Sequence, residues 1–168
     1  METMTVERVI DAPIDEVFAW LTTTTNYTSS PLVLRCRLTR HGETAPYGVG
    51  AVRNHLWLIG WFRERITHYD PPYATDYVVE RSLPPSRHEL GRMTFTEVDG
   101  GTQVRWTTRA EIPVPLLGTL LTRHIARPII TRTFGNILDA ANAALTQHPR
   151  WERGLTSADA PTNGNKPR

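Results

Sequence analysis

Between residues 32 and 112 the chain repeatedly alternates apolar with polar side chains, which is the two-residue period of half-buried β-strands. Turn-forming residues separate the alternating runs at close spacing, so we expect the strands to be joined as antiparallel hairpins. The sharpest turn signal is Asp99-Gly100, because a tight hairpin turn needs residues that tolerate positive φ. Counting outward from this turn predicts these opposite pairs on one apolar face: Phe95 with Val104, Met93 with Trp106, Gly91 with Thr108, and Glu89 with Ala110.

The segments on either side of this region carry different patterns. Residues 3–10 are rich in β-branched side chains and predict a first strand, after which Asp11-Ala12-Pro13 opens a short helix. The threonine-rich residues 22–30 predict a turn or a second, frayed helical piece. Apolar residues then recur every three or four positions between residues 117 and 145, which predicts one helix of about thirty residues with a kink at Pro128.

This order of elements allows one economical packing. We expect an α+β fold in which a curved antiparallel sheet of seven strands wraps its apolar face around the long C-terminal helix. Curvature keeps the two layers from closing tightly, so a cavity is expected between them. A length of 168 residues fits one domain, which we place at residues 1–156. Residues 157–168 offer little apolar surface to bury and are expected to form a disordered tail.

Composition argues against several classes of protein. The longest apolar run, residues 56–62, is far shorter than the ~20 residues of a membrane-spanning helix. The first residues lack the pattern of a secretory signal, so we expect a cytoplasmic protein. Cys36 is the single cysteine and the six histidines lack metal-ligand spacing, so neither a metal nor another cofactor is expected. The 19 basic residues are spread along the chain, which argues against nucleic-acid binding.

The most informative candidates are charged residues in the apolar register of the sheet. If the connections at residues 69–76 and 82–88 are centred symmetrically, Arg81 faces Glu64 on one neighbouring strand and Glu89 on the other. A charge that faces a core is costly unless it is paired. This trio is therefore either a satisfied structural network or a set of groups that orient a ligand.

Other candidates are less specific. His68 and Tyr77, expected as cross-strand neighbours, could form a general acid/base pair or simply pack in the core. His124 lies near the apolar stripe of the long helix and could contact a ligand or lie at its rim. The aromatic hairpin at residues 57–62 either packs at the sheet end or touches a ligand or a membrane surface. The register of the sheet and the apolar stripe of the long helix predict the following ligand-binding residues: Asn54, Leu56, Glu64, Ile66, Tyr77, Val79, Arg81, Glu89, Met93, Trp106, Thr108, Leu121 and His124.

Three segments carry a family resemblance. Residues 9–18 contain an opening strand and an Ala-Pro-initiated helix, residues 64–72 a strand that ends in Asp-Pro-Pro, and residues 101–107 a last strand before the long helix. Together with the element order over residues 4–146, they resemble the SRPBCC superfamily with the START-like helix-grip fold, and within it the polyketide cyclase/dehydrase and lipid-transport group. Two departures are Tyr27, in a region where relatives usually carry tryptophan, and Pro128 in the long helix.

The resemblance implies an apolar cavity but several functions, because one fold hosts many activities. The first hypothesis is binding or carriage of a lipophilic small molecule such as a lipid, isoprenoid or polyketide. The second is a polyketide cyclase or dehydratase in which Arg81, Tyr77 and His68 polarise carbonyls of a poly-β-ketone. The third is a co-chaperone-like interaction protein. Ligand identity, oligomeric state and transient membrane contact stay open.

Overall fold

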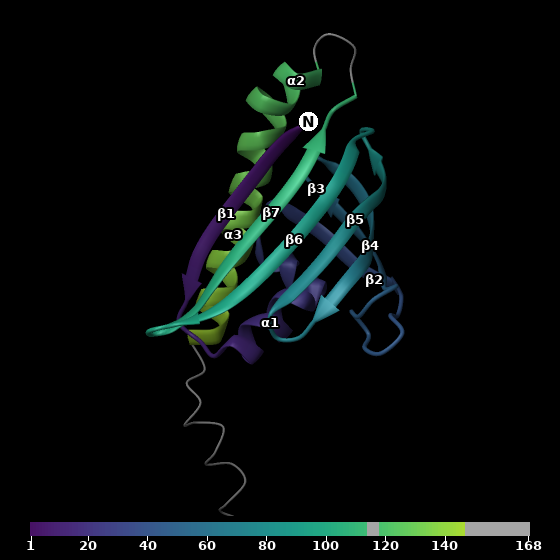
Figure 1. Cartoon of the computed structure of the whole chain (residues 1–168). Coiled ribbons are helices and arrows are strands. Elements are labelled where there is room, and N and C mark those ends of the chain that lie inside the picture. Colours follow the sequence, from purple (N-terminus) through teal and green to yellow (C-terminus); the bar gives the residue numbers. More distant parts are fainter. Residues whose placement is uncertain (114–117, 147–168) are drawn as a thin grey trace, which may run out of the picture.

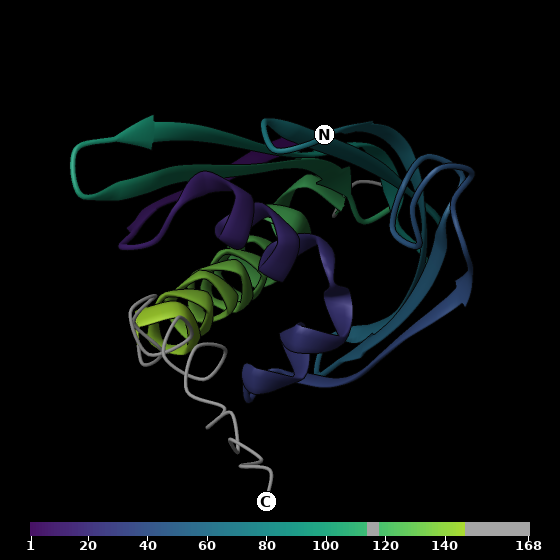
Figure 2. The same ribbon diagram turned by 90° about the horizontal axis from the view of Figure 1, so that it is seen from below.

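The computed structural model of the protein describes residues 1–113 and 118–146. Seven strands form one antiparallel sheet in the order β1-β7-β6-β5-β4-β3-β2. The strands are β1 (Glu2–Ile10), β2 (Val33–Arg40), β3 (Val52–Trp57), β4 (Gly60–Asp70), β5 (Ala74–Leu83), β6 (Arg87–Val98) and β7 (Gly101–Glu111). The sheet curves strongly, and its concave face surrounds the C-terminal helix (Figures 1 and 2). This arrangement confirms the predicted helix-grip fold.

Two short helices close one end of the concave face. Helix α1 (Ile14–Thr22) follows β1, and a 3-10 helix, η1 (Thr24–Ser29), follows α1. The buried side of α1 includes Val17, Phe18 and Leu21, as its apolar spacing predicts. In η1 the Tyr27 hydroxyl is buried and donates to the Leu21 carbonyl at 2.7 Å, which attaches the threonine-rich segment to the end of α1.

The C-terminal helix is one helical segment whose hydrogen bonding changes just before Pro128. Helix α2 (Gly118–Leu121) leads into a π-helical turn, η2 (Thr122–Ala126), and then into α3 (Arg127–Thr146). The Arg127 amide donates to the carbonyl of Thr122, five residues earlier, in the widened turn. Proline has no amide hydrogen and crowds the preceding turn, so a widened turn at this point accommodates it. The predicted interruption at Pro128 therefore has a local structural cause.

The β6–β7 hairpin confirms the register counted from Asp99-Gly100. Val98 pairs with Gly101, Phe95 with Val104, Met93 with Trp106, and Gly91 with Thr108. The register shifts between His88 and Leu90, so His88 lies opposite Ala110. The predicted pairing of Glu89 with Ala110 is wrong, because a β-bulge exchanges which residue faces the concave side.

The predicted trio of Glu64, Arg81 and Glu89 is also wrong. In the β4–β5 pair Glu64 lies opposite Val79 and Arg63 lies opposite Arg81, with register shifts between the pairs. The turn is tighter than symmetric centring assumed, since Asp70 already pairs with Ala74. Successive side chains of a strand point to opposite faces, so a shift of one residue in the pairing changes which side chains face the core. Arg81 therefore lies on the outer, exposed face and not on the concave face as predicted.

Strand β3 has the opposite phase from the one predicted. Arg53, His55 and Trp57 are buried, whereas Leu56 is 40% exposed. The apolar pattern Val52-Leu56 suggested the other face, and an Arg facing inward is costly in isolation. In the folded protein Arg53 is paired with Glu64 of β4, which makes its inward orientation tolerable.

Gly91 is required by the packing of the sheet. It lies opposite Tyr77, and a Cβ atom at this position would overlap the Tyr77 ring. We expect Gly91→Ala to lower the free energy of unfolding by roughly 1–3 kcal/mol, the usual cost of overpacking a core. Urea denaturation measures this loss. In a Tyr77→Ala background the same change should cost far less, and an equal cost in both backgrounds would show that the ring is not the cause.

Two predictions concern chain segments rather than packing. No helix within residues 1–113 and 118–146 is long and apolar enough to cross a membrane. The proposed domain boundary at residue 156 and the tail at 157–168 lie outside the described residues.

Candidate functional site

A cavity of about 190 Å³ lies between the concave face of the sheet and the C-terminal helix. The β3–β4 hairpin contributes Trp57, Ile59 and Phe62 to its wall, and the C-terminal helix contributes Ile129 and Phe134. The remaining lining includes Pro84, Pro85 and Ile112, from connections at one end of the sheet, and four polar side chains that matter below: Glu64, Tyr77, His88 and Thr108. The site is thus a mainly apolar pocket with a small polar region, the usual composition of a small-molecule site.

Glu64 is the buried carboxylate of the cavity wall, which also contains Glu111. Its Oε2 atom accepts a hydrogen bond from Arg53 Nε at 2.8 Å and lies 3.2 Å from His55 Nε2. Burial raises the pKa of Glu64, but His55 and Arg53 outweigh burial and lower this pKa to about 2. Glu64 therefore stays negatively charged at neutral pH, even though it is buried beside apolar side chains.

Arg53 is the counter-charge, and it lies behind Glu64 rather than in the cavity lining. Its side chain is 1% exposed, and its guanidinium lies 4.9 Å from the centre of the Tyr77 ring. Burial lowers the pKa of Arg53, but Glu64 together with Tyr27 and Tyr77 outweighs burial, so the net pKa is above its usual value. Arg53 Nη2 has no hydrogen-bond partner among the described residues. The pair is consequently held by one charged hydrogen bond and by stacking on an aromatic ring.

Cys36, His55 and Glu64 form a linear contact series that resembles a nucleophilic arrangement. Cys36 Sγ lies 3.0 Å from His55 Nδ1 on the side of the ring opposite Glu64. However, burial and the Glu64 charge raise the pKa of Cys36 to about 12, with Arg53 opposing the rise. A protonated thiol is a poor nucleophile. Cys36 also does not line the cavity, so we interpret this series as a structural network.

His88 is held in its neutral form by its two hydrogen bonds. The Val79 amide donates to His88 Nδ1 at 3.2 Å, so the ring proton resides on Nε2, which lies 2.9 Å from Thr108 Oγ1. Burial lowers the pKa of His88, which also favours the neutral ring, whereas the Glu64 charge opposes this effect. Since Thr108 Oγ1 accepts from His88, the Thr108 hydroxyl proton is available to donate to a bound molecule.

Two further polar groups belong to aromatic residues of the wall. Tyr77 OH accepts a hydrogen bond from Trp106 Nε1 at 3.0 Å, and burial raises the pKa of Tyr77. Trp57 Nε1 is buried and has no hydrogen-bond partner among residues 1–113 and 118–146. A buried N–H without a partner is unfavourable and would gain from an acceptor supplied by a ligand.

The structure brings part of the predicted ligand set to the cavity. Glu64, Tyr77, Val79 and Thr108 line it, and their contact with a ligand stays a prediction. Ile66, Met93 and Trp106 are buried in the core without lining the cavity. Leu121 is partly buried on the helix but is not part of the lining.

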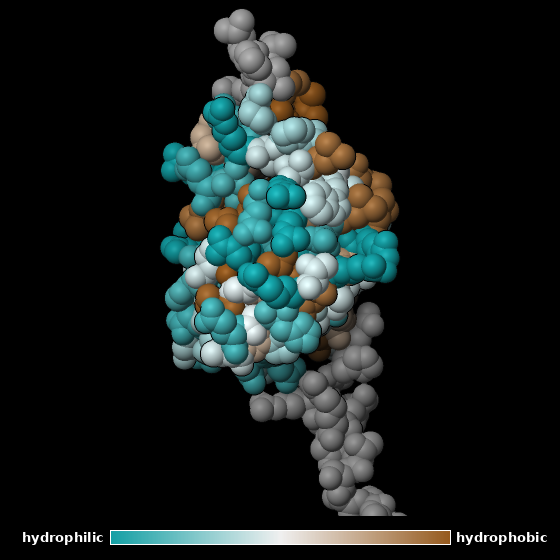
Figure 3. All heavy atoms as spheres, turned by 90° about the vertical axis from the view of Figure 1, so that its right-hand side faces the viewer, coloured by the Kyte–Doolittle hydropathy of each residue, from teal (hydrophilic) through white to brown (hydrophobic). Residues whose placement is uncertain are grey.

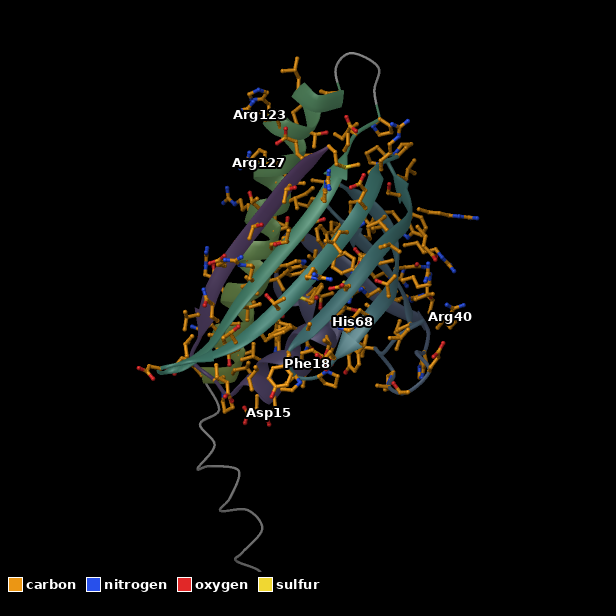
Figure 4. All side chains as sticks on the ribbon, viewed as in Figure 1. Asp15, Phe18, Arg40, His68, Arg123 and Arg127 are labelled. Carbon is orange, nitrogen blue, oxygen red and sulfur yellow. The ribbon has the colours of Figure 1, made fainter. Side chains whose placement is uncertain are left out.

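The other predicted residues lie elsewhere. Glu89 is exposed and pairs with Arg109 at 3.2 Å, and Arg81 and His124 are exposed. The exposed His68 lies toward the end of the molecule that carries Phe18 and Asp15 (Figure 4). Neither Arg81 nor His68 lines the cavity. Asn54 and Leu56 are on the outer face, for the reason given for β3.

The predicted ligand set did not contain Arg53, His55, Trp57 or His88, although Trp57 belonged to the aromatic hairpin that was considered for ligand contact. The first three form their own alternating series in β3, so the sequence contains the correct phase beside the more apolar one that was predicted. The sequence did contain a signal for this phase. The inward-facing Glu64 needs a positively charged or hydrogen-bonding partner, and Arg53 and His55 can serve only if they share its face of the sheet. His88 had no such signal, since its orientation depends on the bulge in β6.

Curved sheet, enclosed helix and internal apolar cavity together define a START-like helix-grip protein. Residues 1–148 match the model of the family described as polyketide cyclase / dehydrase and lipid transport, and the chain belongs to this family. The resemblance stated from the sequence is thereby confirmed. A comparison with curated proteins found no match.

Solved structures share the fold at low sequence identity. The protein TTHA0849 from Thermus thermophilus is 16% identical, with a TM-score of 0.69, and the match covers 94% of this chain and 100% of that chain. The protein XoxI from Bacillus cereus is 17% identical, with a TM-score of 0.66 and coverage of 89% and 100%. The di-domain ARO/CYC StfQ from the steffimycin biosynthetic pathway is 17% identical, with a TM-score of 0.57 and coverage of 86% and 45%.

Proposed function

We propose that the protein binds and carries a compact lipophilic small molecule in the cavity between sheet and helix. The observation that carries this proposal is an apolar cavity with the buried, ionised Glu64 in its wall; the second acidic residue of the lining, Glu111, is paired with the N-terminal ammonium group. Drug-sized ligands usually occupy pockets of roughly 300–1,000 Å³. A cavity of about 190 Å³ therefore suits a small ligand, or the end of a longer lipid, isoprenoid or polyketide chain whose remainder extends through the mouth.

The charge of Glu64 restricts the polar group that the ligand can carry. A carboxylate placed against a second carboxylate in an apolar pocket suffers repulsion with little screening. A hydroxyl group can instead donate to Glu64 and accept from Thr108 or Trp57. We therefore favour a neutral, hydroxyl-bearing ligand over a free fatty acid.

Displacement of a neutral fluorescent probe tests this selectivity. We expect N-phenyl-1-naphthylamine to bind the folded protein and octanol to displace it at least roughly ten-fold more effectively than octanoate, a difference of about 1.4 kcal/mol. In the variant Arg53→Met/Glu64→Gln, which removes both charges, the preference for octanol should become smaller, because only the cost of burying the octanoate carboxylate remains. Equal displacement from the parent protein would refute the selectivity, and a flat probe titration would refute the cavity as a binding site.

A cyclase or dehydratase is the second candidate, supported by the structural likeness to an ARO/CYC protein. Such chemistry needs a group that can accept or donate a proton near neutral pH. Glu64 is too weak a base, Cys36 is protonated, and both ring nitrogens of His88 are engaged. Because none of these three is ready to move a proton, binding without chemistry is the better supported function.

A further inference from the structure

Exposed aliphatic side chains lie next to residues that line one end of the cavity, which is called its mouth below. Leu58 is 60% exposed and Leu83 is 68% exposed, and their chain neighbours Ile59 and Pro84 line the cavity. On the helix, Ile125 lines the cavity and is itself 52% exposed. The β3–β4 turn and the β5–β6 connection touch, since a Cβ at Gly60 would overlap the Leu83 carbonyl and approach Pro84. Leu58, Leu83 and Ile125 are called the apolar rim below.

The apolar rim is part of a larger hydrophobic area. Apolar side chains gather on the upper part of the face formed by the outer side of the sheet (Figure 3). Leu34 and Leu56 of the neighbouring strands β2 and β3 are exposed as well, and Leu56 and Leu83 pair with the same residue, Trp61. A contiguous exposed apolar area on a folded protein often marks a contact surface.

Arginines without acidic partners accompany the rim. Arg81 lies two residues before Leu83, Arg87 begins β6, and Arg123 belongs to η2. All three are exposed, and none forms an ion pair with a described residue. Arg123 and Arg127 lie at the end of the molecule opposite Asp15 and Phe18 (Figure 4).

Acidic residues of the same region are already neutralised. Glu80 is paired with Arg63 and Arg65, Glu89 with Arg109, and Glu111 with the N-terminal ammonium group. Glu2 lies 3.8 Å from Arg127. The charge near the mouth that has no ion-pair partner is therefore positive. It is carried by the long, exposed side chains of Arg81, Arg87 and Arg123.

We propose that the apolar rim and Arg81, Arg87 and Arg123 dock the protein, mouth first, on a bilayer surface that contains anionic lipids. Aliphatic side chains would enter the interface, and the arginines would contact lipid phosphates. The rim comes from two turns and a helix, so it forms no continuous groove for a peptide. A bilayer requires no matching shape, which favours it over an acidic protein. Docking goes beyond the proposed ligand binding and does not depend on it.

Co-sedimentation of the full chain with vesicles tests the proposal. We expect binding to vesicles of phosphatidylcholine mixed with phosphatidylserine, weaker binding to phosphatidylcholine alone, and weaker binding at high salt. Leu58→Ser/Leu83→Ser should lower the partition coefficient at least ten-fold. Arg81→Gln/Arg123→Gln should remove the preference for phosphatidylserine. Because all four side chains are exposed, the variants should fold and still bind the neutral probe.

Matched controls come from the rest of the surface. Tyr73→Ser removes an exposed aromatic residue from the β4–β5 turn, and Arg40→Gln removes an exposed arginine at the end of β2. Neither should change vesicle binding. The proposal is overturned if the parent protein does not sediment with phosphatidylserine vesicles, or if the control variants lose as much binding as the rim variants. Probe binding that survives either result shows that ligand binding stands without docking.

Discussion

Arg53→Met is expected to lower the free energy of unfolding by roughly 3–5 kcal/mol, because it leaves Glu64 buried without its counter-charge. The hydrogen bond from Arg53 Nε to Glu64 Oε2 would be lost together with the stacking on Tyr77. Equilibrium urea unfolding measures the change, provided that the slope with denaturant stays constant.

A second variant separates the loss of the pair from the loss of packing. Arg53→Met/Glu64→Gln removes both charges and leaves no unpaired carboxylate, so most of the stability should return. Arg81→Met is the matched control, since Arg81 is exposed and should stay within about 0.5 kcal/mol of the parent. If the Arg53 and Arg81 variants are equally stable, Glu64 does not depend on Arg53.

Acid should destabilise the protein through the same carboxylate. The ordinary pKa of a glutamate is 4.5, and His55 and Arg53 hold the pKa of Glu64 near 2 in the folded protein. The unfolded chain therefore binds a proton more readily than the folded chain. The stabilisation is fully present above pH 4.5 and is lost as the pH falls toward 2. Its size is on the order of 3 kcal/mol.

Unfolding at a series of pH values, in the parent and in Arg53→Met/Glu64→Gln, measures this contribution. We expect the parent to lose stability between pH 4.5 and 2, and the variant to lose much less over the same interval. His88 also makes the protein less stable as the pH falls, but at higher pH, because burial lowers its pKa from 6.5. This effect should be the same in the parent and in the variant. Identical pH profiles below 4.5 would mean that Glu64 does not titrate with folding.

The stability and pH predictions above both concern Glu64 and Arg53, and only Glu64 was placed correctly from the sequence. Glu64 was assigned to the concave face correctly, but its partner was taken to be Arg81 instead of Arg53. The alternation of β4 is continuous around Glu64, whereas β3 offers two alternating series of similar quality. Choosing the more apolar series is a sound rule for isolated strands. It failed in β3 because the free energy of burying Arg53 depends on a residue of the neighbouring strand.

Features that depend on neighbours along the chain could be determined from the sequence by itself. The Asp99-Gly100 turn sets the β6–β7 register, the apolar spacing of α1 sets its buried side, and Pro128 accounts for the altered turn in the long helix. Together with the element order, these features were enough for the fold. Only the tertiary structure decided the register of β4 and β5, the bulge that turns His88 inward, and the phase of β3. Strand pairing at a loosely specified turn has several registers of similar local energy, and contacts between residues far apart in the sequence, such as Tyr77 over Gly91 and Arg53 on Glu64, select among them.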